Sequence, residues 1–504
     1  MGERTRLGLG ILGGALALGG LGDALLRATP WGVNFLLWIT ALVGLSLLLV
    51  MWGRVGTGGE GRWLVFVALL FAFGVVLRDS TVVVFLDVVA VLISLSLAVW
   101  RGHSGSLRRA GLSEYVLGGA YAGSLSSAGP IPVSVSDVDW REVVRGRWKG
   151  QALAVSRGVL LAAPLLLLFG ALFVAADAIF ERLVLDVFGF DLAEIFQHLL
   201  LISVFAWITA GMFWTGLMAR APENLVIRRP RIISLGIVEV GIVLGLLDLL
   251  FLAFVAIQVR YLFGGAERVA ATAGLTYAEY ARRGFFELVT VTALTLPLLL
   301  LSHWLLRREN RAHERVFMAL AAIMVGLLFV VVASALQRMY LYQQAFGLTE
   351  LRLYTTVFMA WISAVLLWFV FTVLRNRRDS FAFGALVAGF VAILAINAMN
   401  PDAIIARTNV ERAENGRELD VYYLTTLSAD AVPVLVKAFP EIGDKRFQDR
   451  WTGERHTFRG EITDRWNAKN SDWRTWNLGR SRARLSVRTY LEEQAGRMPT
   501  MARR

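Results

Sequence analysis

The sequence predicts an all-α fold: a polytopic transmembrane bundle of about 11 helices, followed by a small, mainly helical C-terminal extramembrane tail. Three observations support this prediction. Of the 504 residues, 56% are hydrophobic, only 18% are charged, and the apolar residues gather in long runs. A helix needs about 20 apolar residues to cross the hydrocarbon core of a bilayer. The composition therefore excludes an ordinary soluble enzyme.

Eleven apolar runs are bounded by charged residues. They cover residues 7–25, 32–52, 63–77, 81–100, 158–176, 196–218, 232–256, 285–305, 316–336, 354–374 and 381–399. We interpret the first, which is rich in glycine, as a span, and a cleaved signal segment is the alternative. The third is short and is joined to the fourth by Arg78-Asp79-Ser80, which predicts a tight helical hairpin.

The basic residues predict the topology, because none of the 51 lysines and arginines falls inside these runs. With a cytoplasmic N-terminus, 23 lie on inner segments, nine in short outer loops and 19 after residue 399. Inner loops of membrane proteins carry the excess of positive charge. An odd number of spans then places the C-terminus on the outer side. The net charge of +12 is thus explained by topology, so we expect membrane lipids as partners and no nucleic acid.

The chain divides into four parts. Residues 1–100 form the first four transmembrane segments, 101–157 a cytoplasmic loop, 158–399 a seven-span membrane core, and 400–504 an extracytoplasmic tail containing tryptophan and arginine. Within the loop, the Gly/Ser stretch 118–129 predicts a flexible hinge, because its small residues impose little structure. The mixed-charge run 137–149 predicts a short amphipathic helix on the inner membrane surface, and a regulatory docking site is the alternative.

Several distinctive runs point to a family. In the tail they are Asn400-Pro-Asp-Ala-Ile-Ile-Ala-Arg-Thr-Asn, Leu419-Asp-Val-Tyr-Tyr-Leu, Leu427-Ser-Ala-Asp-Ala-Val-Pro and Asp472-Trp-Arg-Thr-Trp-Asn-Leu, and in the membrane region they are residues 258–265, 277–285 and 346–354. Together they resemble the DUF4153/DUF4173 group of bacterial polytopic membrane proteins, over roughly residues 78–478. The resemblance implies a protein of the bacterial cytoplasmic membrane. It implies no substrate and no catalytic residue, because the family has no established activity.

Ionisable residues inside apolar spans are the first candidate site. Asp87, Glu239 and Asp248 are costly to place in a bilayer, and Asn397 is a polar neighbour on the last span. We expect an ion or proton path built from these four residues. The alternative is that each acid only ties helices together by hydrogen bonds. Glu239 and Asp248 are nine positions apart, so they point to opposite faces of one helix and cannot pair.

A second candidate site lies in the predicted outer loop 337–353. Arg338, Tyr340, Tyr342 and Arg352 combine charge and aromatic rings, which suits recognition of a headgroup, a sugar or the tail. Simple anchoring at the membrane interface is the alternative.

The tryptophans of the tail have two interpretations. Trp451, Trp466, Trp473 and Trp476 crowd into a short arginine-rich stretch. Indole rings favour the headgroup zone, so the stretch could lie on the outer membrane surface, and the core of a small domain is the equal alternative.

Familiar catalytic motifs are absent from the sequence. There is no cysteine, the five histidines lack metal-ligand spacing, and no phosphate-binding loop or nucleophile elbow occurs. We therefore identify no catalytic residue, metal ligand or cofactor. The favoured function is transport or permeation of an ion or small solute by means of the intramembrane carboxylates. Two alternatives stay open: a non-catalytic envelope sensor or scaffold with a membrane or envelope protein partner, and a lipid-linked-substrate enzyme at the outer face, using Asp23 with Arg338 and Arg352.

Overall fold

A computed structural model describes most of the chain. The described residues are 2–55, 60–101, 106–143, 169–170, 172–173, 176–177, 180, 192–219, 234–262, 285–307, 310–375, 377–448, 453–467 and 472–497. Among them, nine helices are long and apolar enough to cross a membrane: α1 (Glu3–Leu26), α2 (Val33–Trp52), α4 (Thr81–Trp100), α9 (Leu192–Leu217), α10 (Ile237–Leu262), α13 (Phe285–Leu305), α14 (Arg311–Phe346), α15 (Glu350–Thr372) and α16 (Phe381–Met399). A shorter apolar helix, α3 (Gly61–Leu77), forms the predicted hairpin with α4. The predicted all-α membrane bundle is confirmed, whereas the predicted span 158–176 lies almost wholly outside the described residues.

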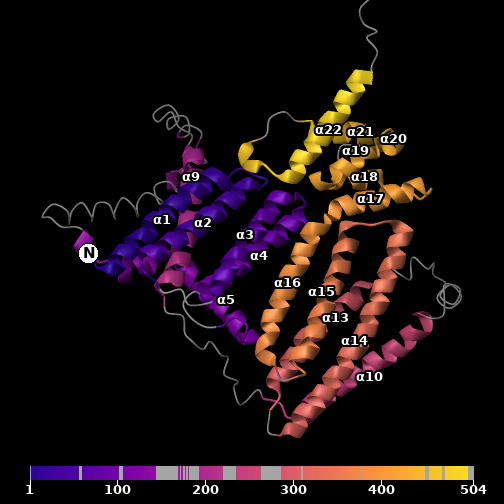
Figure 1. Ribbon diagram of the computed structural model, residues 1–504, viewed down its shortest axis with the longest axis horizontal. Coiled ribbons are helices and arrows are strands. Elements are labelled where there is room, and N and C mark those ends of the chain that lie inside the picture. Colours follow the sequence, from indigo (N-terminus) through magenta and orange to yellow (C-terminus); the bar gives the residue numbers. More distant parts are fainter. Residues whose placement is uncertain are drawn as a thin grey trace, which may run out of the picture.

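The membrane helices form two groups, which Figure 1 shows side by side. Helices α1 to α4 and α9 surround one apolar core, with Ile11 and Phe71 fully buried in it. Helices α10 and α13 to α16 surround a second core that includes Phe317 and Phe369. Helix α16 contacts both α4 and α15, so it links the two groups.

Helix α14 corrects the predicted loop 337–353. It has 36 residues, so it is about 54 Å long and exceeds the hydrocarbon core of about 30 Å. The polar residues after 336 continue the helix, because none of them breaks it before Gly347, which has a φ of +81°. Only residues 347–349 form the turn to α15.

The predicted flexible hinge is also corrected. Residues Leu112–Ser127 form helix α5, which packs against α4 and α9. Its glycine content permits close packing, since a Cβ at Gly118 would lie 2.1 Å from the indole of Trp100. A short helical turn (Val133–Asp137) and α6 (Trp140–Val143) follow. Most of the predicted amphipathic helix 137–149 lies outside the described residues.

The tail is a small domain with a core of its own, which we call the C-terminal domain (residues 400–497). Its elements are α17 (Pro401–Glu414), α18 (Val421–Thr426), η4 (Ala429–Ala431), α19 (Val432–Lys437), α20 (Phe439–Ile442), β1 (Arg446–Gln448), β2 (Arg455–Thr457), α21 (Phe458–Trp466), η5 (Trp473–Thr475) and α22 (Leu478–Arg497). The two strands pair in antiparallel fashion. Phe439, Phe458 and Trp466 are buried in the core, whereas Trp473 and Trp476 are exposed. The domain interpretation is therefore correct for Trp466, the exposure of Trp473 and Trp476 fits the surface interpretation, and Trp451 lies outside the described residues.

The C-terminal domain covers one end of both helix groups (Figure 1). It contacts the α1–α2 loop through Trp31, the α3–α4 turn through Asp79, and the α14–α15 turn through Leu348. All three connections belong to the predicted outer side. The structure thus places these three predicted outer turns on one face, together with the domain.

Candidate functional site

The structure brings together two of the four predicted intramembrane residues. Asp87 on α4 is fully buried, and its Oδ1 accepts a hydrogen bond of 2.7 Å from Nδ2 of Asn397 on α16. The other oxygen, Oδ2, has no hydrogen-bond partner among the described residues and lies against Gly74 of α3. Asp87 lies seven residues after Ser80, so it is about 10 Å from the end of its helix.

The other two predicted acids lie elsewhere. Glu239 is exposed in the first turn of α10, and its carboxylate accepts a hydrogen bond from the amide of Gly236. It is a capping residue, because the helix begins at Ile237 and not at residue 232 as predicted. Asp248 is buried within α10, and neither of its oxygens is hydrogen-bonded to a described residue. Figure 1 shows α10 beyond α14, far from α4, so the three acids do not converge.

The four predicted outer recognition residues do not form one surface either. Arg338 is buried in α14, and its Nη2 donates a hydrogen bond of 2.9 Å to Gln258 of α10. Tyr340 is exposed. Arg352 stacks 4.0 Å from the centroid of the Tyr342 ring. Arg338 therefore joins α14 to α10. Of the four residues, only the stacked pair of Arg352 and Tyr342 lies at the turn between α14 and α15, where Arg352 donates to the carbonyl of Gly347.

A polar site joins the bundle to the C-terminal domain. We call it the interdomain joint: Arg78, Asp79, Ser80, Asp430 and Arg480. Asp430 Oδ2 accepts hydrogen bonds from the backbone amides of Asp79 (2.7 Å) and Ser80 (3.3 Å), at the start of α4. In return, Asp79 Oδ2 accepts one of 3.2 Å from the amide of Ala429, at the start of η4. Each carboxylate thus accepts hydrogen bonds from backbone amides at the start of the helical element beside the other carboxylate.

Two arginines compensate the charge of these carboxylates. Arg480 Nη1 lies 2.5 Å from Asp79 Oδ1, and its Nη2 donates to the carbonyls of Trp31 (2.9 Å) and Thr475 (2.7 Å). Arg78 Nη1 lies 3.9 Å from Asp430 Oδ1. Arg480 therefore ties three separate segments together with one guanidinium group, which its five donors allow.

Burial perturbs the acids on the domain side of this joint. It raises the pKa of Asp430 to about 6, against the lowering effect of the Asp79 amide and Arg78. Burial likewise raises the pKa of Asp402, although this side chain accepts a hydrogen bond of 3.1 Å from the amide of Ser428. Desolvation disfavours the charged form of a carboxyl group, so part of the joint can take up protons on mild acidification.

The intramembrane pair is connected to the joint. Asn397 donates to Asp87 through its side chain, and its backbone carbonyl accepts a hydrogen bond of 2.6 Å from Nε of Arg78. Arg78 in turn faces Asp430 of the C-terminal domain. A polar chain, in which the backbone of Asn397 links two hydrogen bonds and an ion pair ends the series, therefore runs from a buried acid in the bundle to the extramembrane domain.

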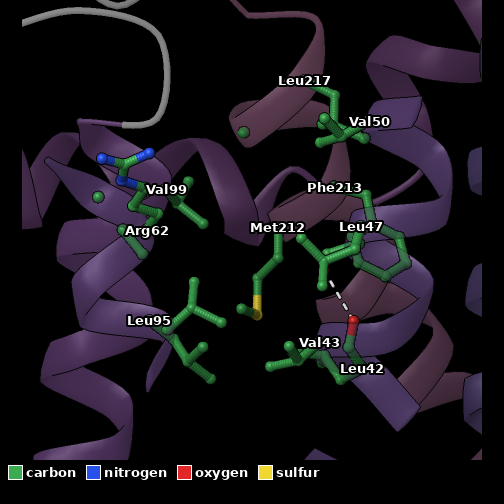
Figure 2. A pocket seen from close by; sticks show the side chains of 15 residues that line it. Leu42, Val43, Leu47, Val50, Arg62, Leu95, Val99, Met212, Phe213 and Leu217 are labelled. Atoms are coloured by element: carbon green, nitrogen blue, oxygen red, sulfur yellow. Dashed lines mark hydrogen bonds between the residues drawn. The ribbon is translucent and has the colours of Figure 1, made fainter. Parts of the chain in front are cut away.

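An apolar cavity of about 180 Å³ lies at the opposite ends of α2, α3, α4 and α9. Figure 2 shows Leu47 and Leu95 pointing toward Met212 from either side, with Arg62 at the edge. Ser46, which also lines the cavity, donates its hydroxyl to the carbonyl of Leu42. The cavity therefore suits an aliphatic chain and offers no cluster of groups for chemistry.

Comparison with known proteins agrees with the motifs. The family model described as a domain of unknown function, DUF4153, matches residues 65–438. No curated protein and no solved structure matches the chain. The matched region contains Asp79 and Asp430, whereas Arg480 lies beyond its end.

Proposed function

The chain belongs to the DUF4153 family, and from this premise we propose that it is a non-catalytic sensor or scaffold of the bacterial cytoplasmic membrane. The observation that supports the proposal is the polar chain from Asp87 to the C-terminal domain. An acid buried in a membrane span is costly and points to a function. Here only two residues, Asn397 and Arg78, stand between the buried Asp87 and Asp430, the acid that contacts the bundle from the extramembrane domain. The domain would report the state of the bundle to a membrane or envelope protein partner.

A change of charge on Asp87 would alter this chain at its first link. The carboxylate accepts a hydrogen bond from Asn397 Nδ2, whereas a protonated carboxyl group can donate one to Asn397 Oδ1. That amide oxygen is buried without a hydrogen bond among the described residues, so it is available as an acceptor. Reorienting Asn397 would then shift the carbonyl that holds Arg78.

Amide hydrogen exchange on the full chain in nanodiscs tests this coupling. Asp87→Asn removes the charge with little change of shape, and we expect faster or slower exchange in peptides containing the amides of Asp79 and Ala429. The matched control is Asp248→Asn, which neutralises another buried acid on a helix far from the joint. Equal exchange at the joint in the wild type and in Asp87→Asn would remove the proposal.

The proposed orientation has a cytoplasmic N-terminus and an extracytoplasmic C-terminal domain. Because the chain has no cysteine, single cysteines give a clean label. Glu418 on the domain and Arg109 on the predicted inner loop are both exposed. We expect a membrane-impermeant maleimide to label Glu418→Cys on intact cells and Arg109→Cys only after permeabilisation. The reverse pattern would invert the topology.

Transport or permeation is a second proposal, and Asp248 is the observation that favours it. This acid is buried, and neither of its oxygens has a hydrogen-bond partner among the described residues, as expected for a group that binds a proton or a cation. Ion flux into proteoliposomes should fall with Asp248→Asn and stay unchanged with Glu239→Gln. No flux in the wild type would leave the sensor proposal alone.

A further inference from the structure

A polar cavity lies where the C-terminal domain meets the ends of α1 and α9, away from the polar chain described above. Its volume is about 540 Å³, which is in the range of ligand sites. Seven of its 11 lining residues are ionisable, so it suits a charged ligand. They are Asp23, Arg27, Glu194, His198, Asp472, Arg474 and Arg484.

The helices and the domain each contribute to the walls. Asp23 on α1 is buried, and its Oδ2 lies 2.5 Å from Nδ1 of His198 on α9. Arg27 contacts the other ring nitrogen of that histidine. On the domain side, Arg474 donates a hydrogen bond of 2.6 Å to the carbonyl of Ala24, which fixes η5 against the end of α1. The cavity is therefore held between two parts of the chain that are firmly attached.

Each carboxylate in the cavity has a partner, and one arginine is left without one in the part of the chain that the structure describes. Asp23 pairs with His198, Glu194 lies 3.8 Å from Arg27, and Asp472 lies 2.6 Å from Arg474. These three contacts use every carboxylate that lines the cavity. Arg484 on α22 also lines it, half-buried, and has no hydrogen bond or ion pair with any described residue. Its guanidinium group is the one available for an anion.

The cavity lies beside groups that favour the membrane surface. Trp473 and Trp476, on either side of Arg474 and Thr475, are 63% and 45% exposed. Exposed indole rings prefer the level of the lipid headgroups. Leu26 is the last residue of the membrane helix α1, and the next residues, Arg27 and Ala28, line the cavity. The cavity is therefore at the level where this helix leaves the hydrocarbon core. An anion at this level is most simply a phosphate group.

We propose that this cavity binds a phosphate ester, with Arg484 as the principal contact and Arg27 and Arg474 beside it. The three basic side chains Arg27, Arg474 and Arg484 are all arginines, whose planar fork matches the oxygens of a phosphate in pairs. A lipid headgroup and a soluble phosphate ester share this chemistry. The cavity shares no residue with the polar chain from Asp87 to Asp430, so this proposal does not depend on the sensor proposal.

The experiment uses the full chain in detergent, with two probes. Inorganic phosphate is titrated by calorimetry, and phosphatidylglycerol is compared with phosphatidylcholine by native mass spectrometry. We expect Arg484→Gln to weaken binding of at least one anionic probe about ten- to a hundredfold, as for the loss of a charged hydrogen bond, and Arg484→Lys to weaken it less. The matched control, Arg482→Gln, changes an exposed arginine on the same helix outside the cavity and should have no effect.

The outcomes separate the sources of the phosphate. Binding of phosphatidylglycerol but not of phosphate identifies a lipid site, and binding of phosphate alone identifies a soluble ester. Equal affinities in Arg484→Gln and Arg482→Gln would overturn the proposal, as would a failure of both probes to bind the wild type. Unchanged melting of Arg484→Gln shows that the variant is folded, which we expect because the side chain has no described partner to lose.

Discussion

Arg480 gives the sharpest prediction about the interdomain joint. In Arg480→Met the stem is kept and the guanidinium group is lost, so Asp79 loses its ion pair at 2.5 Å and the carbonyls of Trp31 and Thr475 lose a donor. The arginine side chain is only 8% exposed and that of the aspartate 15%, so little water can replace these contacts. Removing one partner of a buried pair costs about 3–5 kcal/mol.

The assay is amide exchange at the seat of the domain. The amide of Val33 donates a hydrogen bond of 2.9 Å to the carbonyl of Trp476, so it exchanges when this edge of the domain opens. A cost of about 3 kcal/mol raises the population of the open form roughly 100-fold, and exchange of the Val33 peptide should accelerate by that factor. Arg482→Met, two residues further along α22, is the exposed control and should shift exchange less than about twofold. Equal rates in Arg480→Met and Arg482→Met would refute the reasoning.

Three further predictions concern the joint and the buried acid. Asp430 has its pKa raised to about 6 from 3.8, so its stabilising contribution is complete below pH 3.8 and is lost as the pH rises through 6. Opening of the joint, corrected for intrinsic exchange, should be about tenfold less frequent at pH 5 than at pH 7. Asp430→Asn should reduce this difference and leave the part that Asp402 contributes, and an unchanged pH slope would contradict the prediction. Gly74→Ala places a Cβ 2.5 Å from Asp87 Oδ2 and should lower stability by about 1–3 kcal/mol in thermal melting. Gly13→Ala, which meets nothing within 4 Å, should be neutral or stabilising, and equal melting of the two variants would exclude the close contact as the cause. Asn397→Ala should lower the free energy of unfolding by about 1–3 kcal/mol. A double-mutant cycle with Asp87→Ala should show a coupling energy above about 0.5 kcal/mol, and additive effects would show that the hydrogen bond contributes nothing to stability.

Much of the bundle could be predicted from the sequence, because a bilayer requires long apolar helices that can be recognised locally. The pairing of Asp87 with Asn397 was within reach for the same reason, since polar groups inside spans are few and must find one another. Helix ends were less predictable. The charge of Arg338 predicts a loop. A charged residue can nevertheless continue a helix when its side chain is hydrogen-bonded to a neighbouring helix, as Arg338 is to Gln258.

Contacts between distant segments could not be predicted from spacing alone. The sequence offers 19 basic residues after position 399, and nothing local distinguishes Arg480 as the partner of Asp79, 401 residues away. The same holds for His198 and Asp23, which are separated by 175 residues. The Leu427-Ser-Ala-Asp-Ala-Val-Pro run carries a local helix-start pattern, in which the Ser428 side chain accepts a hydrogen bond from the amide of Asp430. It gave no sign that the Asp430 carboxylate caps a different helix.

The reciprocal contacts of Asp79 and Asp430 help to define which part of this chain can fold as one unit. The family match stops at residue 438, inside the C-terminal domain. A chain cut there would keep both carboxylates but lose Arg480, together with Asn477, whose side-chain amide donates 2.8 Å hydrogen bonds to the carbonyls of Val75 and Arg78. Two negative charges would then face each other without their main counter-ion. The smallest fragment expected to fold with the C-terminal domain bound to the bundle must therefore extend through α22. The structural unit thus continues well past residue 438, where the family match ends.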